Sequence, residues 1–326
     1  MKPLRELIAN FKGKRVVVFG DLVADVFVYG EISRISREAP VLVLNHRETQ
    51  IVPGGGANAI HNLWALGASP VPIGVVGDDA EGRQLLEYFS ERGIETGGII
   101  AAKSYRTPSK TRILAGAVHA QRQQIVRMDV GAALTDEKSQ SAAARKLKAA
   151  IKEADALLVS DYGYGLAAPQ VIANAWKNSI PATIDSRFSL MRFSKMTAAT
   201  PNEPEVEAAL GISIGNDAAK LEWAGRTLLR KLKHDALLIT RGKDGMALFE
   251  RGKKTTCIPI HGSDEVADVT GAGDTVIATF TLALASGAGY QEAAYLANYA
   301  GGIVVMKYGT RPVTHEELVQ TVEAAT

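Results

Sequence analysis

The chain has 326 residues, 46% of them hydrophobic and 22% charged, which is the composition of a globular protein and excludes wholesale disorder. Lys and Arg number 37 against 35 Asp and Glu, a net charge of +2, so no basic field marks a nucleic-acid binder. The single cysteine, Cys257, excludes an intrachain disulfide framework and a zinc site of several thiolates. The first residues are charged and do not resemble a secretory signal, and no apolar run reaches the ~20 residues that cross a bilayer. We therefore expect a cytosolic protein.

Short β-branched runs alternate along the chain with longer amphipathic stretches. Five apolar runs are typical of strands in a parallel sheet that is covered on both faces. In chain order they are residues 15–20, 71–77, 156–160, 182–184 and 236–240. The helical patterns are residues 57–66, 81–92, 136–153, 217–232 and 275–285. This order predicts an α/β fold, doubly wound, with a mostly parallel central sheet flanked by helices.

Two stretches, at about residues 26–51 and 104–129, break this alternation. They contain alternating polar and apolar segments at residues 40–44, 109–114 and 124–129. Such alternation is typical of antiparallel strands with one face in solvent. The sequence therefore predicts a single domain over residues 1–326, with a small β-sheet lid inserted from the two stretches.

The strongest motif is DVTGAGDT at residues 268–275, directly before an apolar helix. Its glycines leave the backbone unshielded, so the amides of Gly271, Ala272 and Gly273 can point at an anion with the help of the helix dipole. A carboxylate at Asp274 competes with that anion, unless it takes a proton from a hydroxyl that attacks a phosphoryl group. The alternative is that Asp274 only caps the helix.

A second motif, PGGGANA at residues 53–59, is a glycine run that opens a helix. Glycines permit close approach of the backbone to a ligand. Asn58 offers a hydrogen-bond donor and an acceptor to sugar hydroxyls. A tight turn would explain the run equally well.

The two motifs, in this order and far apart, resemble the paired signatures of the ribokinase-like (PfkB) carbohydrate kinases. Residues 20–25 resemble that family's first sugar-binding strand end, residues 200–205 contain its Asn-x-x-Glu, and residues 240–245 resemble its nucleotide loop. The resemblance covers about residues 14–318. It implies ATP-dependent transfer of a phosphoryl group to a sugar hydroxyl.

The resemblance implies a role for each matching residue. Asp274 would be the base, and the amides of residues 271–273 would stabilise charge on the transferred phosphoryl group. Glu205 would hold Mg²⁺ through water, because magnesium dehydrates reluctantly. The residues implied to bind the nucleotide and its phosphates are Asn202, Glu205, Thr240, Arg241, Gly242, Gly245 and Asn298. The residues implied to hold the sugar are Asp25, Gly55 and Asn58.

Alternatives stay open for parts of this assignment. Pro201 and Asn202 could form a plain turn before a capped helix, and residues 241–242 could be a surface hairpin. In the resembling family, a loop beside the anion site often binds K⁺. Asp268, Thr270 and the turn at residues 307–310 occupy the corresponding places, and Lys307 could instead supply the positive charge itself.

A closer resemblance is carried by residues 29–41, 123–129 and 160–163. These are similar to the kinase domain of bacterial heptose-7-phosphate kinases. The resemblance implies transfer to C1 of D-glycero-D-manno-heptose 7-phosphate. Many relatives carry a C-terminal nucleotidylyltransferase, an activity that we do not expect of a chain ending at Thr326.

Two positions depart from the heptose kinase pattern. Tyr164 replaces the usual Lys of Asp-Tyr-x-Lys-Gly, and Asp185-Ser186-Arg187 replaces the usual Asp-Pro-Lys. A kinase for another sugar, sugar phosphate or nucleoside therefore stays an alternative. A non-catalytic sugar or nucleotide sensor is a second alternative, against which the intact Asp274 argues.

A phosphorylated acceptor needs cationic partners, because its charge is costly to bury unpaired. The candidates to receive its phosphate are Arg34, Lys110, Arg112 and Arg187. On a wet β face such side chains are more often a solvated surface than ligands, and a phosphate on the substrate changes that weighing. A lone small sheet is marginal in water, so we expect the lid's apolar faces, including Val41 and Val43, to pack against a second subunit. The expected cofactors are ATP and Mg²⁺, with K⁺ as a candidate, and we expect neither nucleic acid nor a membrane as partner.

Overall fold

A computed structural model describes residues 3–116, 122–177, 179–262, 268–307 and 309–325. Its large sheet has nine strands in the order β13-β12-β11-β10-β9-β8-β1-β4-β5. These are β1 (Arg15–Gly20), β4 (Ser69–Gly77), β5 (Ile99–Ala102), β8 (Ala156–Asp161), β9 (Ala182–Ser186), β10 (Ala198–Ala199), β11 (Ala236–Thr240), β12 (Met246–Glu250) and β13 (Thr256–Ile258). All pairs are parallel except β11–β12 and β12–β13. The predicted α/β fold with a mostly parallel sheet is confirmed.

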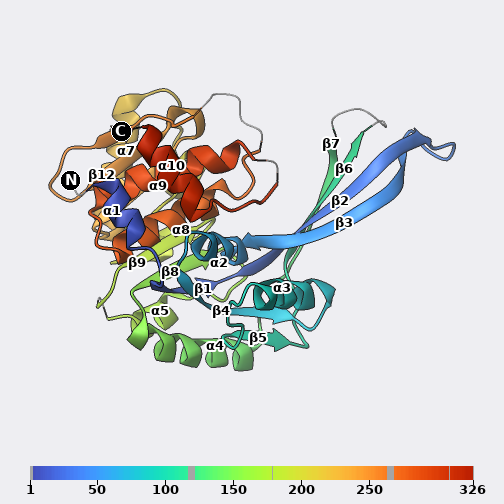
Figure 1. The fold of residues 1–326 in the computed structure, drawn as a ribbon, viewed down its shortest axis with the longest axis horizontal. Helices are drawn as coiled ribbons and strands as arrows, with labels where there is room; N and C mark the ends of the chain where they lie inside the picture. The colour runs from blue at the N-terminus through green and yellow to red at the C-terminus, as the bar shows by residue number, and fades with distance from the viewer. Residues whose placement is uncertain (1–2, 117–121, 178, 263–267, 308, 326) are drawn as a thin grey trace.

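Helices cover both faces of this sheet (Figure 1). They are α1 (Leu4–Ala9), α2 (Gly56–Ala65), α3 (Ala80–Glu91), α4 (Glu137–Ala150), α5 (Pro169–Ala175), α6 (Glu203–Leu210), α7 (Ala218–Leu232), α8 (Ala272–Ala285), α9 (Tyr290–Val305) and α10 (His315–Ala324). Strand β1 shows why its apolar run does not alternate: Val16 and Val18 join one hydrophobic core, and Val17 and Phe19 the other. Consecutive side chains of a strand point to opposite faces, and here both faces are buried.

A second sheet of four strands, in the order β3-β2-β6-β7, forms the lid. Its strands are β2 (Leu22–Ile35), β3 (Leu42–Gly55), β6 (Ser109–Gly116) and β7 (Gln123–Val130). The lid projects from the α/β body as a long twisted ribbon (Figure 1). Its base is buried and its far end is exposed, as the burial along β2 shows. Among the described residues, no helix is long and apolar enough to cross a membrane.

Three boundaries differ from the sequence prediction. Helix α8 begins at Ala272, three residues earlier than expected, so the glycine motif is the helix start itself. Helix α4 ends at Ala150 and continues as a 3₁₀ turn over Ile151–Glu153. Strand β3 begins at Leu42, because the chain turns tightly before it, with the amide of Ser36 donating to the carbonyl of Val41 at 2.8 Å.

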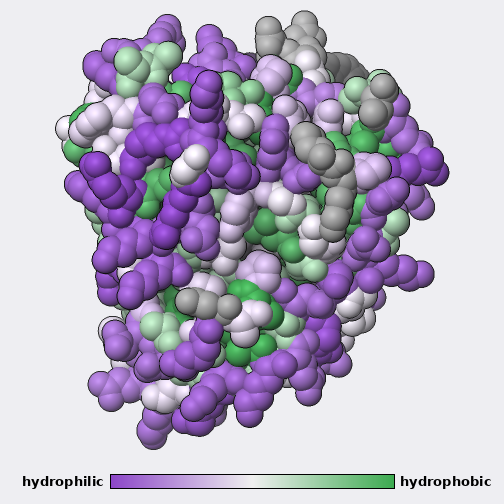
Figure 2. Space-filling view, turned by 90° about the vertical axis from the view of Figure 1, so that its left-hand side faces the viewer, coloured by the Kyte–Doolittle hydropathy of each residue, from purple (hydrophilic) through white to green (hydrophobic). Residues whose placement is uncertain are grey.

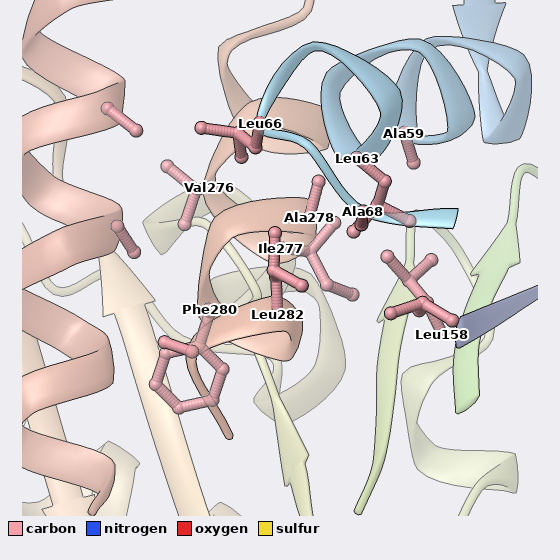
Figure 3. Packing of buried hydrophobic residues seen from close by; sticks show 14 of the residues in the cluster. Ala59, Leu63, Leu66, Ala68, Leu158, Val276, Ile277, Ala278, Phe280 and Leu282 are labelled. Carbon is pink, nitrogen blue, oxygen red and sulfur yellow. The ribbon is translucent and has the colours of Figure 1, made fainter. Parts of the chain in front are cut away.

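Helix α8 is apolar on all sides because it is packed on all sides. Figure 3 shows Val276, Ile277, Phe280 and Leu282 of α8 among side chains of α2 and Leu158 of β8. All of these α8 side chains are at most 4% exposed. A helix that is hydrophobic all round is a buried one. The packing fixes the helix axis, and with it the position of the first turn, where the glycine motif lies.

Candidate active site

The carboxyl ends of five neighbouring parallel strands meet at one edge of the large sheet. The polar residues that follow these ends are Asp21 after β1, Tyr162 after β8, Arg187 after β9, Asn202 after β10 and Arg241 after β11. Ligands bind at this edge in open α/β sheets. The start of α8 and the base of the lid reach the same edge, and the site is built from these parts.

Asp274 lies in the first turn of α8 and is only 3% exposed. The N-cap of the helix is Gly271, in a left-handed conformation with φ of 77°. The alternative reading of Asp274 as the helix cap is therefore wrong. Its carboxylate faces the interior, where the lid base and the loop after β8 meet the helix.

Two side chains hold the carboxylate of Asp274. The amide of Asn58 donates to Oδ2 at 3.0 Å, and the hydroxyl of Tyr162 donates to Oδ1 at 2.8 Å. Asn62 fixes the Asn58 amide by donating to its Oδ1 at 3.1 Å. Burial raises the pKa of Asp274 to about 6, against the lowering effect of both hydrogen bonds and of the charge on Lys110. A carboxyl group with this pKa is ionised at neutral pH and can still take a proton, as a general base must.

The amides at the start of α8 form the candidate anion site. The first N–H groups of a helix have no partner within it, and the helix dipole favours an anion there. A Cβ on Gly271 would lie 2.5 Å from Nδ2 of Asn58 and 2.8 Å from Cγ2 of Thr310. A Cβ on Gly273 would meet no heavy atom of the described residues within 4 Å. The helix start is therefore tightly packed at Gly271 and open at Gly273, where an anion can approach.

The glycine run before α2 makes room for two side chains of the site. A Cβ on Gly54 would lie 2.6 Å from a carboxylate oxygen of Asp25. Gly55 has φ of 55°, and a Cβ there would lie 3.1 Å from the ring of Tyr162. The run lets both side chains lie against the backbone, so it does more than turn the chain. That Gly55 contacts the sugar stays a prediction.

The base of the lid brings three predicted residues to this site. Asp25 is 4% exposed, and Arg112 donates from Nη1 to its Oδ1 at 2.7 Å. Lys110 is 9% exposed, with its ammonium 4.3 Å from the centre of the Tyr162 ring. Burial lowers the pKa of Lys110, while Asp25 and Asp274 raise it. Arg112 forms its ion pair with Asp25. Lys110, the other buried cation of the lid, has no ion-pair partner in the part of the chain that the structure describes.

Asp21 fixes the loop after β8. Its carboxylate accepts amide hydrogen bonds from Tyr162 and Tyr164, each at 2.9 Å, and from Leu166 at 3.4 Å. Burial raises the pKa of Asp21 to about 6, partly offset by these amides. Asp21 therefore places the Tyr162 ring between the lid and Asp274.

Asp185 and Glu205 form a second acidic pair at the strand edge. Burial and the charges of Glu205 and Asp274 raise the pKa of Asp185, and burial also raises that of Glu205. Glu205 forms a capping box with Asn202, whose amide it binds at 2.9 Å. The alternative of a capped helix is therefore correct for this motif. Two crowded carboxylates are also ligands that suit Mg²⁺, whose charge would relieve their repulsion, so Glu205 and Asp185 fit the expected ion.

The predicted nucleotide loop is a tight turn that ends at Gly245. The amide of Arg241 donates to the carbonyl of Gly245 at 2.9 Å, and Gly242 and Gly245 both have positive φ. The guanidinium of Arg241 pairs with Glu203 at 2.9 Å. The amide of Thr240 donates to Pro201 at 3.0 Å, which joins the loop to the Asn202 segment.

Asn298 of α9 is 6% exposed. Its amide donates to the carbonyl of Pro259 at 2.9 Å. This bond ties α9 to the segment after β13, and a contact of Asn298 with the adenine stays a prediction.

The loop before α8 is the candidate potassium site. The carboxylate of Asp268 accepts amide hydrogen bonds from Thr270 at 2.9 Å and from Gly309 at 3.1 Å. It thereby joins the two segments that the sequence predicts to surround the cation. The hydroxyl of Thr310 is buried without a hydrogen-bond partner among the described residues. A buried oxygen of this kind fits a role as a ligand of the expected cation. Tyr308 lies outside the described residues.

Lys307 does not supply the positive charge at that loop. Its ammonium donates to the carbonyl of Pro312 at 2.8 Å and to the carboxylate of Glu317 at 2.7 Å. The alternative role of Lys307 is therefore wrong, because its charge is neutralised by α10.

The remaining cations predicted to bind a phosphate lie apart from each other. Arg187 follows β9 and lies close enough to Lys110 for its charge to lower the pKa of that lysine. Arg34 is exposed and lies nine residues further along β2 than Asp25, about 30 Å at the rise of a strand. Within one chain the structure does not bring Arg34 to the site.

A cavity of the described structure lies away from this site. It has a volume of about 570 Å³ and is lined by Trp176, Lys195, Lys233 and Arg251, among others. These residues lie at the amino ends of β9 to β11 or beside them, away from the carboxyl ends that carry the site. The three basic side chains are exposed, and none of the predicted site residues lines the cavity.

The family follows from a comparison with known sequences. The pfkB family carbohydrate kinase profile matches residues 14–317. The chain belongs to this family. The bifunctional protein HldE of Geobacter sulfurreducens is 41% identical over 98% of the chain, and that of Mesorhizobium japonicum is 38% identical over 97%. The chain spans 65% and 64% of the length of these two relatives.

Solved structures of two other kinases share the fold. Arabidopsis thaliana ribokinase, complexed with ribose and ATP, matches with a TM-score of 0.72 and 20% identity, over 96% of this chain and 99% of that one. Escherichia coli phosphofructokinase-2 in complex with potassium matches with a TM-score of 0.76 and 19% identity, with the same coverage. At these identities the likeness establishes the fold alone, and the protein is a PfkB carbohydrate kinase, a phosphotransferase, on its sequence.

Two residues of this PfkB kinase site escaped the site prediction from sequence. Tyr162 contacts Asp274, and Asp185 crowds Glu205. Both stand at carboxyl ends of predicted strands, a position that could have indicated them. The sequence does not show that the carboxyl ends of these two strands lie near the start of α8, because that depends on the strand order.

Proposed function

We propose that this PfkB kinase transfers the γ-phosphoryl group of ATP to a hydroxyl of a sugar phosphate, with C1 of D-glycero-D-manno-heptose 7-phosphate as the acceptor. The observation that carries the proposal is the buried Asp274, held by Asn58 and Tyr162 beside the open helix start at Gly273. The identity of 38–41% to the HldE relatives supports the choice of acceptor.

The chemistry follows from the position of Asp274. The acceptor hydroxyl gives its proton to the carboxylate while its oxygen attacks the γ-phosphorus, and the bond from phosphorus to the ADP oxygen breaks. The amides of residues 271–273 stabilise the negative charge on the transferred group. Mg²⁺, when bound near Glu205 and Asp185, supplies positive charge to the phosphates of ATP. Burial excludes water, which would otherwise compete with the acceptor.

A phosphate on the acceptor would give a direct partner to the lid cation Lys110, which forms no ion pair among the described residues. Lys110 is buried, and Arg187 stands close to it. A second anion at this place would offset the cost of burying the ammonium group. Arg112, which is held by Asp25, orients that carboxylate toward the sugar hydroxyls.

A different phosphorylated sugar is the second candidate. Tyr164 and Ser186-Arg187 replace the residues that heptose kinases have at these positions, and Ser186 bonds to Asp161 at 2.7 Å instead of facing the acceptor. An altered edge of the site favours an altered acceptor. A sensor without catalysis is disfavoured by the intact Asp274.

An assay with ATP and Mg²⁺ decides between these acceptors. The panel contains heptose 7-phosphate, several hexose phosphates, a nucleoside and the free sugars. We expect kcat/KM to be largest for heptose 7-phosphate and lower by at least about tenfold for the free heptose, since a charged hydrogen bond contributes about 1.5–3 kcal/mol. Turnover of the free sugar at the same rate would contradict the phosphate assignment.

The cations are tested separately from the panel. Arg187→Ala should raise KM for the sugar phosphate several-fold more than KM for ATP, whereas Arg192→Ala, an exposed arginine outside the site, should change neither. Equal effects of the two variants would remove Arg187 from the acceptor site.

We also propose that K⁺ binds at the Asp268 loop and that two copies pair through their lids. Only in such a pair could the distant Arg34 reach a sugar phosphate, and this would be the sugar phosphate bound to the partner.

Activity that is equal in sodium, potassium and bulky-cation buffers would contradict the cation site. The cytosolic location stays a prediction.

A further inference from the structure

The hydrogen bond between Tyr162 and Asp274 is the least explained contact of the site. A base that must accept a proton already receives donors on both oxygens, at 2.8 Å from Tyr162 and at 3.0 Å from Asn58. Asn58 is built into a network that reaches Asn62, Thr275 and α8. Tyr162 comes from a different part of the chain, the loop after β8.

The ring of Tyr162 has two close neighbours in the site. Gly55 lies against one part of it, where a Cβ would come within 3.1 Å, and the Lys110 ammonium lies 4.3 Å from its centre. The backbone amide of Tyr162 is tied to Asp21 at 2.9 Å. These contacts restrict the side chain, and in the orientation that the structure shows its hydroxyl donates to Asp274.

We infer that Tyr162 is a positioning residue for Asp274, holding the carboxylate toward the acceptor and keeping it ionised, with Lys110 strengthening the phenol as a donor. The inference rests on the proposed role of Asp274 as the base. A phenol beside an ammonium group donates more strongly, because the positive charge stabilises its oxygen. Burial and the negative charge of Asp274 raise the pKa of Tyr162, so the phenol keeps its proton and remains the donor.

Proton transfer balances without any change at Tyr162. The O–H bond of the acceptor breaks, its proton moves to Asp274, and its electron pair forms the bond to phosphorus. Each carboxylate oxygen has two lone pairs, so Asp274 can accept the new proton while Tyr162 and Asn58 stay bonded.

The charged groups around Asp274 come from several elements. Lys110 on β6 acts to lower the pKa of Asp274, and Asp25 on β2 acts to raise it. Asp185 at the end of β9 is close enough for Asp274 to raise its pKa. A variant that removes only the Tyr162 hydroxyl leaves these charges in place, so any change in the pH profile reports the lost hydrogen bond.

Tyr162→Phe tests the inference, because phenylalanine keeps the ring against Gly55 and Lys110. We expect the acid limb of kcat/KM to move to higher pH by about one unit, since a hydrogen bond to the charged form of an acid lowers its pKa. Well above that limb, kcat should fall about tenfold while KM for ATP is unchanged. Tyr88→Phe is the matched control: this tyrosine lies on α3 outside the site, and its hydroxyl contacts the ring of His61 at 3.0 Å.

The outcomes separate the inference from the proposed function. An unmoved acid limb in Tyr162→Phe, or the same loss at every pH in both tyrosine variants, overturns the positioning role. If Asp274→Asn keeps wild-type turnover, the base assignment fails whatever Tyr162 does. A limb that moves only in Tyr162→Phe, with the melting temperature unchanged, supports the inference.

Discussion

At the scale of single residues, the reaction depends on the protonation state of Asp274. The carboxyl group accepts a proton only when it is ionised, and burial raises its pKa to about 6. We therefore expect kcat/KM to fall below about pH 6, by ~10-fold per pH unit, as one group becomes protonated. A pH profile of the free enzyme measures this limb. A limb near pH 4, where an exposed carboxyl titrates, would show that the group in control is not this one.

Residue-scale prediction from sequence worked where a motif is local. Asp274, Asn58 and the glycines of both motifs lie together, as expected. The prediction that Arg34 binds the acceptor phosphate is wrong within one chain. The distance of Arg34 from the site depends on the length of strand β2, which the sequence pattern does not give. Tyr162 was missed because its importance arises from a contact 112 residues away in sequence, and no local pattern carries such a contact.

At the scale of elements, the start of α8 combines a rigid and an open glycine. Gly271 needs a positive φ and touches Asn58 and Thr310, so Gly271→Ala should destabilise the fold by about 1–3 kcal/mol and also reduce kcat. Gly273 has open space, so Gly273→Ala should leave stability unchanged or raise it by up to about 1 kcal/mol. Its methyl group would nevertheless stand where the phosphoryl group approaches.

We therefore expect Gly273→Ala to fold normally and to lose at least about tenfold in kcat/KM for ATP, the cost of one lost contact to a charged group. Thermal melting and initial rates of the two glycine variants measure both properties. A Gly273→Ala enzyme with full activity would show that the anion does not bind at the start of α8.

The elements themselves followed from the sequence because both faces of the sheet are buried. The apolar strands and the helices between them gave a regular alternation, and the fold class is confirmed. The start of α8 was placed three residues late, since glycine disfavours a helix interior and the packing of the buried residues from Asp274 onward overrides that preference. The sequence pattern does not give the order of the strands. Which residues meet at the site depends on that order, so it could not be predicted either.

At the scale of the whole molecule, the lid carries a group of exposed apolar side chains on one small sheet. Exposed large apolar side chains of the lid are Ile32, Ile35, Val41, Leu42, Ile125, Val126 and Met128. Figure 2 shows the face that points away from the lid, where hydrophilic side chains dominate and hydrophobic ones lie in separate patches. A projecting sheet with exposed edges and apolar side chains is a surface for a partner.

We expect the protein to be a dimer at assay concentration. Val126 and Met128 point to the same face of β7, being two residues apart. The double variant Val126→Lys and Met128→Lys should therefore shift the mass in sedimentation or light scattering from dimer to monomer. Trp223→Lys, which removes an exposed apolar side chain of α7, is the control and should stay dimeric. A wild-type monomer, or a double variant that remains a dimer, would contradict pairing through the lid.

The account depends most on Asp274 as the base of a kinase. The direct measurement is the single-turnover rate of phosphoryl transfer in Asp274→Asn, with ATP and the best acceptor both saturating. Asparagine keeps the shape of the side chain but cannot take the proton. We predict a loss of ~10²–10⁴ in rate with ATP binding retained. A folded Asp274→Asn protein that transfers the phosphoryl group at the wild-type rate would contradict the central claim.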